Sequence, residues 1–221
     1  MKSDKRFVVL GLGSFGTALA RRLSENGCRV TGVDQSEARV EALKDVLYEA
    51  VVGDVTDRAT LEELLVAQAT AVFISLGEKI ETSLLTALHA REVGARRVVV
   101  KGVTDEHGRI LRHLGVERIV FPEAEMAVQL ADSMTWPNVL DALVIDTEHR
   151  LIELAVPEAL SGQTLRQLDL RRKYGCLVLG VKDHLTGHLT LNPDGDFRLT
   201  DDQLLLVIGR KEELARMSQL S

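Results

Sequence analysis

Short runs of apolar, β-favouring residues recur along the first 121 positions of the chain, separated by longer stretches of mixed polarity. The runs return about every 20 to 25 residues, which is the spacing of βα units. In the stretches between them, apolar residues repeat with the period of about 3.6 that places them on one face of a helix. The expected strands cover residues 7–10, 30–33, 50–52, 71–75, 97–101 and 118–121.

Residues that start and end helices stand at the borders of these stretches. Ser36 is an N-terminal cap, and Gly94 and Gly115 stand where glycine ends a helix. Because right-handed crossovers join parallel strands, the pattern predicts an α/β fold, a Rossmann-like parallel six-stranded sheet with helices on both faces. The expected helices cover residues 17–23, 37–46, 81–93 and 104–114, with a short one from residue 57 or 60 to 65.

The pattern changes in the last third of the chain. An expected helix over 123–134 is followed by the break Trp136-Pro137-Asn138, and no further βα unit appears. We therefore expect a Rossmann-like nucleotide-binding domain over 1–140, with crossover helices at about 123–140, and a small α+β C-terminal domain over 141–221. The expected elements of the second domain are strands at 151–156, 176–181, 189–191 and 204–208 and helices at 164–168 and 211–217.

The sequence Gly11-Leu12-Gly13-Ser14-Phe15-Gly16 lies between the first expected strand and the first expected helix, and Asp34 ends the next strand. This order of strand, glycine turn, helix, strand and acid is typical of dinucleotide-binding folds. The first glycine permits a tight turn, the second lets a phosphate approach bare backbone, and the third lets helix and strand pack closely. The helix N-terminus adds N–H donors for phosphate, and Asp34 is placed to accept hydrogen bonds from ribose hydroxyls. The alternatives are a glycine-rich turn with an empty pocket and a strand-terminating turn at Asp34.

Further candidate ligand-binding residues end the neighbouring strands. Asp54 follows the third strand, Ser75 and Gly77 follow the fourth, and Lys101 ends the fifth. Ligands of open α/β sheets sit at this carboxyl edge, so we expect Asp54 near the adenine amino group, Ser75 and Gly77 in the pocket wall, and Lys101 facing the phosphates. The simpler alternatives are a turn or helix cap for Asp54 and a solvated strand end for Lys101.

Composition and charge narrow the function classes. The net charge of -6 argues against nucleic-acid binding, which normally requires a basic face. No apolar run is long enough to span a bilayer, no signal peptide is evident, and both cysteines are expected to be buried thiols, so we expect a cytoplasmic protein. No serine, cysteine or histidine stands in a nucleophile context, which favours a ligand-gated binding module over an enzyme. A small NAD(P)-dependent oxidoreductase is the alternative from another class.

The chain resembles the RCK family (regulators of conductance of K⁺), specifically the cytosolic gating subunits of Ktr and Trk potassium uptake systems. The resemblance covers nearly the whole chain and rests on the combination of its segments rather than on any one of them. The matching segments are residues 9–16, 33–34, 75–77, 100–101, 115–123, 138–141, 170–178 and 201–209.

This resemblance implies a homo-oligomer in which dimers assemble into an octameric ring, docked under a membrane-embedded potassium-conducting subunit of the Ktr or Trk type. The chain would then lie in the cytoplasm, peripheral to the inner face of the membrane. ATP and ADP, or NADH and NAD as in Trk relatives, would set the shape of the ring. The implied contacts are Gly11, Gly13 and Gly16 to phosphates, Asp34 to the ribose, and Lys101 to the terminal phosphates.

The resemblance also implies a cation site and a second ligand. Glu125 would hold a divalent cation or sodium near the γ-phosphate at the dimer interface, with Glu123 a further candidate for the nucleotide site; both acids also simply favour the start of a helix. Some relatives bind cyclic di-AMP around the positions matching Leu165, Leu168, Asp169 and Arg171. Two positions depart from the family. Leu177 stands where such relatives often carry asparagine, and Ser14 stands where many ATP-type relatives carry arginine, which leaves ATP or ADP and NAD(H) open.

Overall fold

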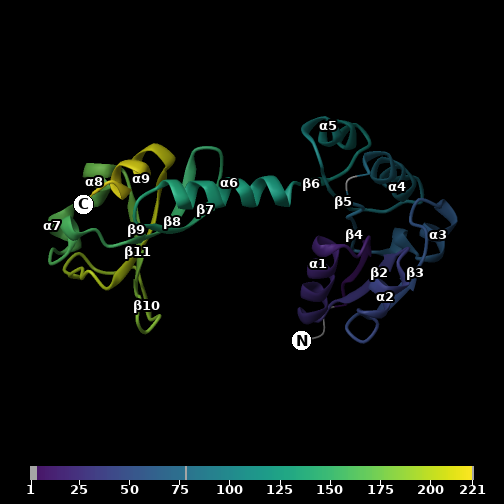
Figure 1. The fold of residues 1–221 in the computed structure, drawn as a ribbon, viewed down its shortest axis with the longest axis horizontal. Coiled ribbons are helices and arrows are strands. Elements are labelled where there is room, and N and C mark those ends of the chain that lie inside the picture. The colour runs from purple at the N-terminus through teal and green to yellow at the C-terminus, as the bar shows by residue number, and fades with distance from the viewer. Residues whose placement is uncertain (1–3, 78, 221) are drawn as a thin grey trace. The chain divides into compact units, whose positions relative to one another are not determined.

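The computed structural model describes residues 4–77 and 79–220, and its contacts divide the chain into two compact units, Met1–Pro122 and Glu123–Ser221. Figure 1 follows the chain through both units. The division falls earlier than the expected boundary at 140. The expected and the observed boundary differ because the helix Pro122–Thr135 is grouped, from Glu123 on, with the second unit.

The first unit contains a six-stranded parallel sheet in the order β3-β2-β1-β4-β5-β6, which confirms the predicted Rossmann-like fold. The order reverses between β1 and β4, because the chain adds strands on one side of β1 and then returns to add the others beyond β4. The strands are β1 (Arg6–Leu10), β2 (Arg29–Asp34), β3 (Glu49–Val52), β4 (Ala71–Ile74), β5 (Val98–Lys101) and β6 (Arg118–Val120). The helices are α1 (Ser14–Glu25), α2 (Glu37–Glu41), α3 (Arg58–Glu63), η1 (Val66–Gln68), α4 (Ile80–Glu92) and α5 (Asp105–His113).

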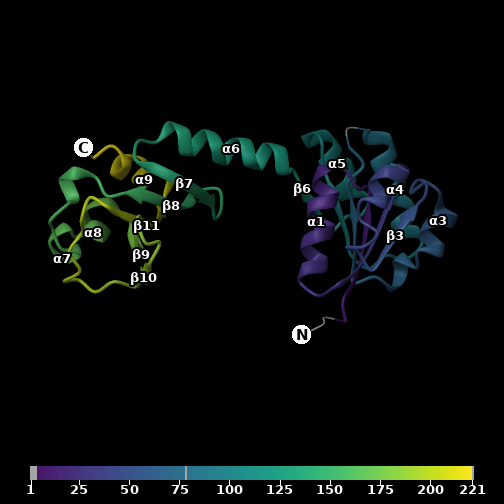
Figure 2. The same ribbon diagram turned by 60° about the horizontal axis from the view of Figure 1, so that its bottom comes forward.

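Helices cover both faces of this sheet. Successive residues of the central strand point to opposite sides, and because Val8, Val9 and Leu10 are all apolar, both faces must be buried. Val8 and Leu10 of β1 pack into a core that includes Ala87 of α4 and Leu111 of α5. Val9 points the other way, into a second core formed with residues of α1 and α2. Figure 2 shows the same elements from a second direction. A strand buried on both faces is typical of parallel α/β sheets and explains the unbroken apolar run that the sequence shows there.

The helix expected over 37–46 is shorter than predicted. α2 ends at Glu41, and the chain continues in turns that bond three residues back, from Leu43 N to Val40 O (3.0 Å) and from Val46 N to Leu43 O (3.0 Å). Leu43 and Leu47 are nevertheless buried. The apolar spacing therefore predicts correctly which side chains are buried. It does not distinguish an α-helix from tighter turns, which bury the same side chains.

The second unit is built on a five-stranded antiparallel sheet in the order β10-β9-β11-β8-β7, and its core lies between this sheet and helices α7 to α9. Ile152, Leu154, Leu205 and Val207 of the central strands share that core with Leu214 of the last helix. This confirms the predicted α+β C-terminal module. Its elements are α6 (Pro122–Thr135), β7 (Val139–Val144), β8 (His149–Ala155), η2 (Glu158–Leu160), α7 (Leu165–Leu168), α8 (Leu170–Tyr174), β9 (Leu177–Asp183), β10 (Leu189–Leu191), β11 (Gln203–Arg210) and α9 (Lys211–Ser218).

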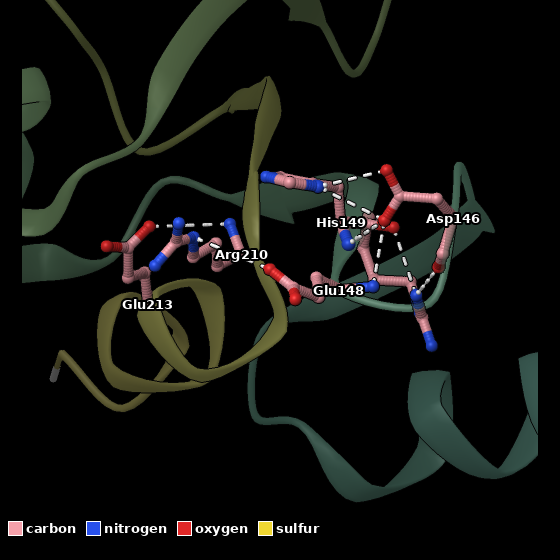
Figure 3. A network of polar contacts seen from close by, with 6 residues as sticks. Asp146, Glu148, His149, Arg210 and Glu213 are labelled. Carbon is pink, nitrogen blue, oxygen red and sulfur yellow. Dashed lines mark hydrogen bonds and ion pairs between the residues drawn. The ribbon is translucent and has the colours of Figure 1, made fainter.

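The turn between β7 and β8 is organised by Asp146 and joined to the start of α9 (Figure 3). One carboxylate oxygen of Asp146 accepts hydrogen bonds from the backbone N–H groups of Glu148 and His149, both at 2.8 Å. These bonds lower the pKa of the Asp146 carboxyl, and the bond from the His149 backbone has the largest effect. The backbone N–H of Lys211 in turn donates to the carbonyl of Glu148 (2.8 Å). The hairpin and the last helix are thus tied together by backbone bonds that a sequence pattern does not reveal.

α6 is attached to the second unit by charge rather than by buried apolar residues. None of its described residues is buried, yet Asp132 lies 3.7 Å from Arg150 Nε on β8 and 3.3 Å from Lys211 Nζ on α9. The side chains of Asp132 and Arg150 are only 14% and 9% exposed. The Arg150 guanidinium also donates to the carbonyls of Asp146 and His149 at 2.6 and 3.0 Å.

Among helices within residues 4–77 and 79–220, none combines the length and apolar character needed to cross a membrane.

Candidate functional site

The candidate site lies at the carboxyl edge of the first unit's sheet, beside the point where the strand order reverses. The glycine loop leaves β1 there, Asp34 ends β2, and Ser75 follows β4. Backbone bonds join these segments: Gly11 N donates to Val33 O, and Ser75 N donates to Leu10 O, both at 2.8 Å. The parallel sheet therefore brings three sequence-predicted segments together at one place.

Gly11 and Gly16 are required by packing. Gly11 has φ +95°, and a Cβ built on it would lie 2.2 Å from the carbonyl oxygen of Ser75. A Cβ on Gly16 would lie 1.9 Å from the carbonyl oxygen of Gly11. Contacts this close to backbone atoms exclude any side chain, so these two glycines let the turn and α1 press against the sheet.

Gly13 differs, because a Cβ built on it would meet no atom within 4 Å. It precedes α1 as the N-cap residue, and no side chain caps that helix end with a hydrogen bond. The first turn of α1 also carries no acidic residue, although acids are the usual partners of a helix N-terminus. The middle glycine therefore leaves open space beside backbone N–H groups and the positive end of a helix dipole, an arrangement suited to a phosphate.

Asp34 is held rigidly beside this loop. Its side chain is 9% exposed, and its Oδ2 accepts a 2.7 Å hydrogen bond from the backbone N–H of Leu12. Oδ1 accepts from the backbone N–H of Ser36 (2.9 Å), and Arg39 Nη1 donates to Oδ2 at 3.3 Å. Asp34 thus fixes the glycine loop, and its predicted contact with a ribose stays a prediction. Sequence reasoning missed the Leu12 and Arg39 contacts, because neither a backbone bond nor an arginine on the polar side of a short helix leaves a pattern.

The other predicted residues of this edge take different roles. Ser75 is buried directly after β4, and Gly77 follows it with φ +71°; their predicted place in a pocket wall stays a prediction. Asp54 forms a turn with Thr56: the Thr56 hydroxyl (2.6 Å) and backbone N–H (2.9 Å) both donate to its Oδ1. These bonds lower the pKa of the Asp54 carboxyl. The cap of α3 is Asp57, whose side chain accepts from Ala59 N at 3.1 Å.

Lys101 ends β5, two strands away from the glycine loop, where its partner across the sheet is Val120 of β6. Neighbouring strands lie about 4.8 Å apart, so the Lys101 backbone is on the order of 10 Å from β1. A lysine side chain covers much of that distance. Its predicted contact with phosphates stays a prediction.

Glu123 and Glu125 lie in the first turn of α6, which the contacts group with the second unit. Their predicted roles at the nucleotide and cation sites stay predictions. Within residues 4–77 and 79–220, no group of three or more histidine, cysteine or acidic side chains is arranged to hold a metal ion by itself. A cation at Glu125 would therefore need other oxygen ligands, such as water, backbone carbonyls or the nucleotide.

Two cavities lie elsewhere. A cavity of about 150 Å³ in the second unit is lined by Leu165, Asp169 and Arg171, three of the positions implied for cyclic di-AMP, and by Leu177. A larger recess of about 560 Å³ lies at the amino edge of the first sheet, away from the glycine loop, and Arg29 packs over the exposed ring of Tyr48 there at 5.5 Å. No pattern in the sequence predicts this recess.

Both cysteines are free thiols; Cys176 is buried in the second unit, whereas Cys28 is only half-buried, so the expectation of two buried thiols holds for Cys176 alone. Burial, the main cause, raises the pKa of its thiol to about 11. A thiol with so high a pKa is protonated at neutral pH and unreactive. Cys176 therefore acts as a small apolar residue of the core, as the sequence predicted.

Comparison with known proteins identifies the family. Residues 7–122 match the TrkA-N domain and residues 150–221 match the TrkA-C domain. The chain is 34% identical to Ktr system potassium uptake protein C of Bacillus subtilis strain 168, over 97% of this chain and 96% of that protein. It is 32% identical to Ktr system potassium uptake protein A of Vibrio alginolyticus, over 96% of each chain.

A solved structure described as the GsuK channel bound to NAD shares the fold. It superposes with a TM-score of 0.67 at 20% identity, and the match covers 99% of this chain. This chain corresponds to 39% of that channel's length. With both domain models matched and relatives aligned over nearly their full length, the chain belongs to the RCK family of regulatory subunits of potassium uptake systems, built from a TrkA-N and a TrkA-C domain.

Proposed function

We propose that the chain senses an adenine nucleotide at the glycine loop and passes that state to a membrane-embedded potassium-conducting subunit. The observation that carries this proposal is the contrast among the three glycines. Backbone atoms pack against Gly11 and Gly16 and exclude any side chain there. Gly13 instead leaves open space beside a helix N-terminus that no side chain caps, and the Asp34 carboxylate is bonded to the same loop. Open backbone at the middle glycine is what a phosphate requires.

ATP and ADP are the first proposed ligands, and NAD(H) is the second. The fold neighbour described as bound to NAD supports the second choice, although it shares only the fold with this chain. Ser14 places a short hydroxyl at the start of α1, so the loop itself supplies no side-chain charge for a γ-phosphate. Discrimination of ATP from ADP therefore depends on Lys101 and on a divalent cation or sodium held at Glu125, the proposed partners of the terminal phosphate.

Regulation requires that the nucleotide bind two conformations of the assembly with different affinity, because equal affinity shifts no equilibrium. We propose a dimer that assembles into an octameric ring, at the cytoplasmic face of the membrane, with no catalytic step. Exposed apolar side chains on consecutive helices support self-association, since a monomer gains nothing from exposing them. They are Leu85 and Leu88 of α4, Ile110 of α5, and Met126, Leu130 and Met134 of α6.

The ribose role of Asp34 can be tested by replacing it with alanine. We expect Asp34→Ala to weaken nucleotide binding by roughly tenfold or more, because it removes the ribose acceptor and releases the Leu12 N–H that shapes the loop. Asp34→Asn is the matched control: its carbonyl oxygen still accepts from Leu12, so it loses charge but retains more of the loop. Calorimetric titration measures both variants. Wild-type affinity in Asp34→Ala would rule out the ribose role.

The regulatory role is tested by reconstitution with a Ktr-type membrane subunit in liposomes. We expect potassium flux to differ between ATP and ADP when this chain is present, and to be insensitive to nucleotide when it is omitted. The control is a chain carrying Asp34→Ala, which should dock but lose the nucleotide response. Equal flux with ATP, ADP and NADH, in a preparation where the chain stays bound to the membrane subunit, would contradict the proposal.

A further inference from the structure

Arg39 of α2 contacts the carboxylate proposed to recognise the ribose. Its Nη1 lies 3.3 Å from Asp34 Oδ2, the same oxygen that accepts the Leu12 backbone N–H at 2.7 Å. The other oxygen, Oδ1, accepts from Ser36 N at 2.9 Å. Among the described residues, three donors therefore converge on Asp34.

The three donors leave too few acceptor positions on Asp34 for both hydroxyls of a ribose. A carboxylate offers about four acceptor positions, and a ribose with both its 2′- and 3′-hydroxyls bound requires two of them. With Leu12, Ser36 and Arg39 in place, about one position remains, on Oδ1. One of the three donors must therefore withdraw before both hydroxyls can bind.

Arg39 is the donor that can withdraw. The N–H groups of Leu12 and Ser36 belong to backbone, and moving them would distort the glycine loop or the start of α2. Arg39 makes the longest of the three contacts, and its side chain is 57% exposed, against 9% for Asp34. A charged pair with one exposed partner contributes little to stability, so its loss is a small cost.

We infer that Arg39 competes with the ribose for Asp34 and so determines how strongly this site distinguishes a ribonucleotide from an analogue without ribose hydroxyls. The inference rests on the proposed function, since it concerns the ligand of the same site. A ribonucleotide displaces Arg39 to form both hydrogen bonds, whereas an analogue without the hydroxyls binds without displacing it. The arginine therefore reduces the advantage that the hydroxyls confer.

The test compares ATP with 2′,3′-dideoxy-ATP on the wild-type chain and on Arg39→Gln, by calorimetric titration. The measured quantity is the ratio of the dideoxy to the ribo dissociation constant within each protein. Using this ratio cancels the general loss of positive charge, which weakens both ligands alike. We expect the ratio to rise about threefold in Arg39→Gln, the size expected for release of one exposed ion pair.

Arg22→Gln is the matched control, because Arg22 pairs with Glu25 near the far end of α1 and does not contact Asp34. Its ratio should equal that of the wild type. An unchanged or lower ratio in Arg39→Gln, with ATP still bound, would overturn the inference while leaving the proposed function intact. Failure of the wild-type chain to bind ATP, ADP and NADH would instead overturn the proposed function and, with it, this inference.

Discussion

Gly16→Ala is expected to destabilise the first unit by about 3 kcal/mol, the upper range for forcing extra atoms into a packed interior. The new Cβ would lie 1.9 Å from the Gly11 carbonyl oxygen and 3.0 Å from its carbon. That carbonyl cannot move aside easily, because Gly11 is held on both sides. Its N–H is bonded to Val33 O at 2.8 Å, and its Cα packs directly against the Ser75 carbonyl. Hydrogen exchange of the β1 and β2 amides under native conditions measures the loss.

Gly13→Ala is the matched control for this prediction. Gly13 has φ −66° and ψ −171°, which alanine adopts without strain, and its Cβ meets no atom within 4 Å. We therefore expect the stability of Gly13→Ala to stay within about 0.5 kcal/mol of the wild type. If Gly16→Ala proves as stable as Gly13→Ala, the close packing of α1 on the glycine loop is wrong.

The second large effect is expected in the other unit, where Asp132→Ala should cost about 3 kcal/mol. The substitution leaves Arg150 largely buried without its carboxylate, and an uncompensated buried charge is far more costly than the loss of a surface pair. It also frees the end of α6, which has no buried apolar residue to hold it. Trp136, the single tryptophan of the sequence, packs against the core of this unit and reports its unfolding in urea by fluorescence.

Asp196→Ala provides the comparison. Asp196 pairs with Arg166 at 3.0 Å, closer than Asp132 to Arg150 at 3.7 Å, but both side chains are more than two-thirds exposed. An exposed pair contributes about 1 kcal/mol or less, so burial rather than distance decides the difference. Equal losses in the two variants would show that Asp132 does not attach α6 to the sheet.

Much of the first unit could be predicted because its strands are short, mostly apolar runs between turn signals. The central strand is buried on both faces, so Val8, Val9 and Leu10 give a strong signal. The second unit was harder. β7 (Val139–Val144) was missed because Asp141 interrupts the run and the register shifts between Val139 and Asp141, which removes the alternation that marks a strand.

The candidate site likewise has features that leave a sequence pattern and features that do not. The glycine spacing and Asp34 were predictable, since turn, phosphate approach and helix packing each demand a particular residue in order. The different roles of Gly13 and of the other two glycines follow from the same spacing, but the backbone atoms that pack against Gly11 and Gly16 were not predictable, because they depend on the fold. The contacts of Asp34 with Leu12 and Arg39 also arise from the fold. Fold-specific contacts of this kind decide how tightly the loop is held.

The claim that the glycine loop binds an adenine nucleotide is tested most directly by calorimetric titration of the purified chain with ATP, ADP and NADH, repeated on Gly13→Ala. We expect saturable binding of ATP and ADP by the wild-type chain. In Gly13→Ala, which keeps its fold, the affinity should fall roughly tenfold or more, because the methyl group occupies the space beside the helix N-terminus that the phosphate needs. Absence of binding by all three nucleotides, or full ATP affinity in Gly13→Ala, would contradict the account.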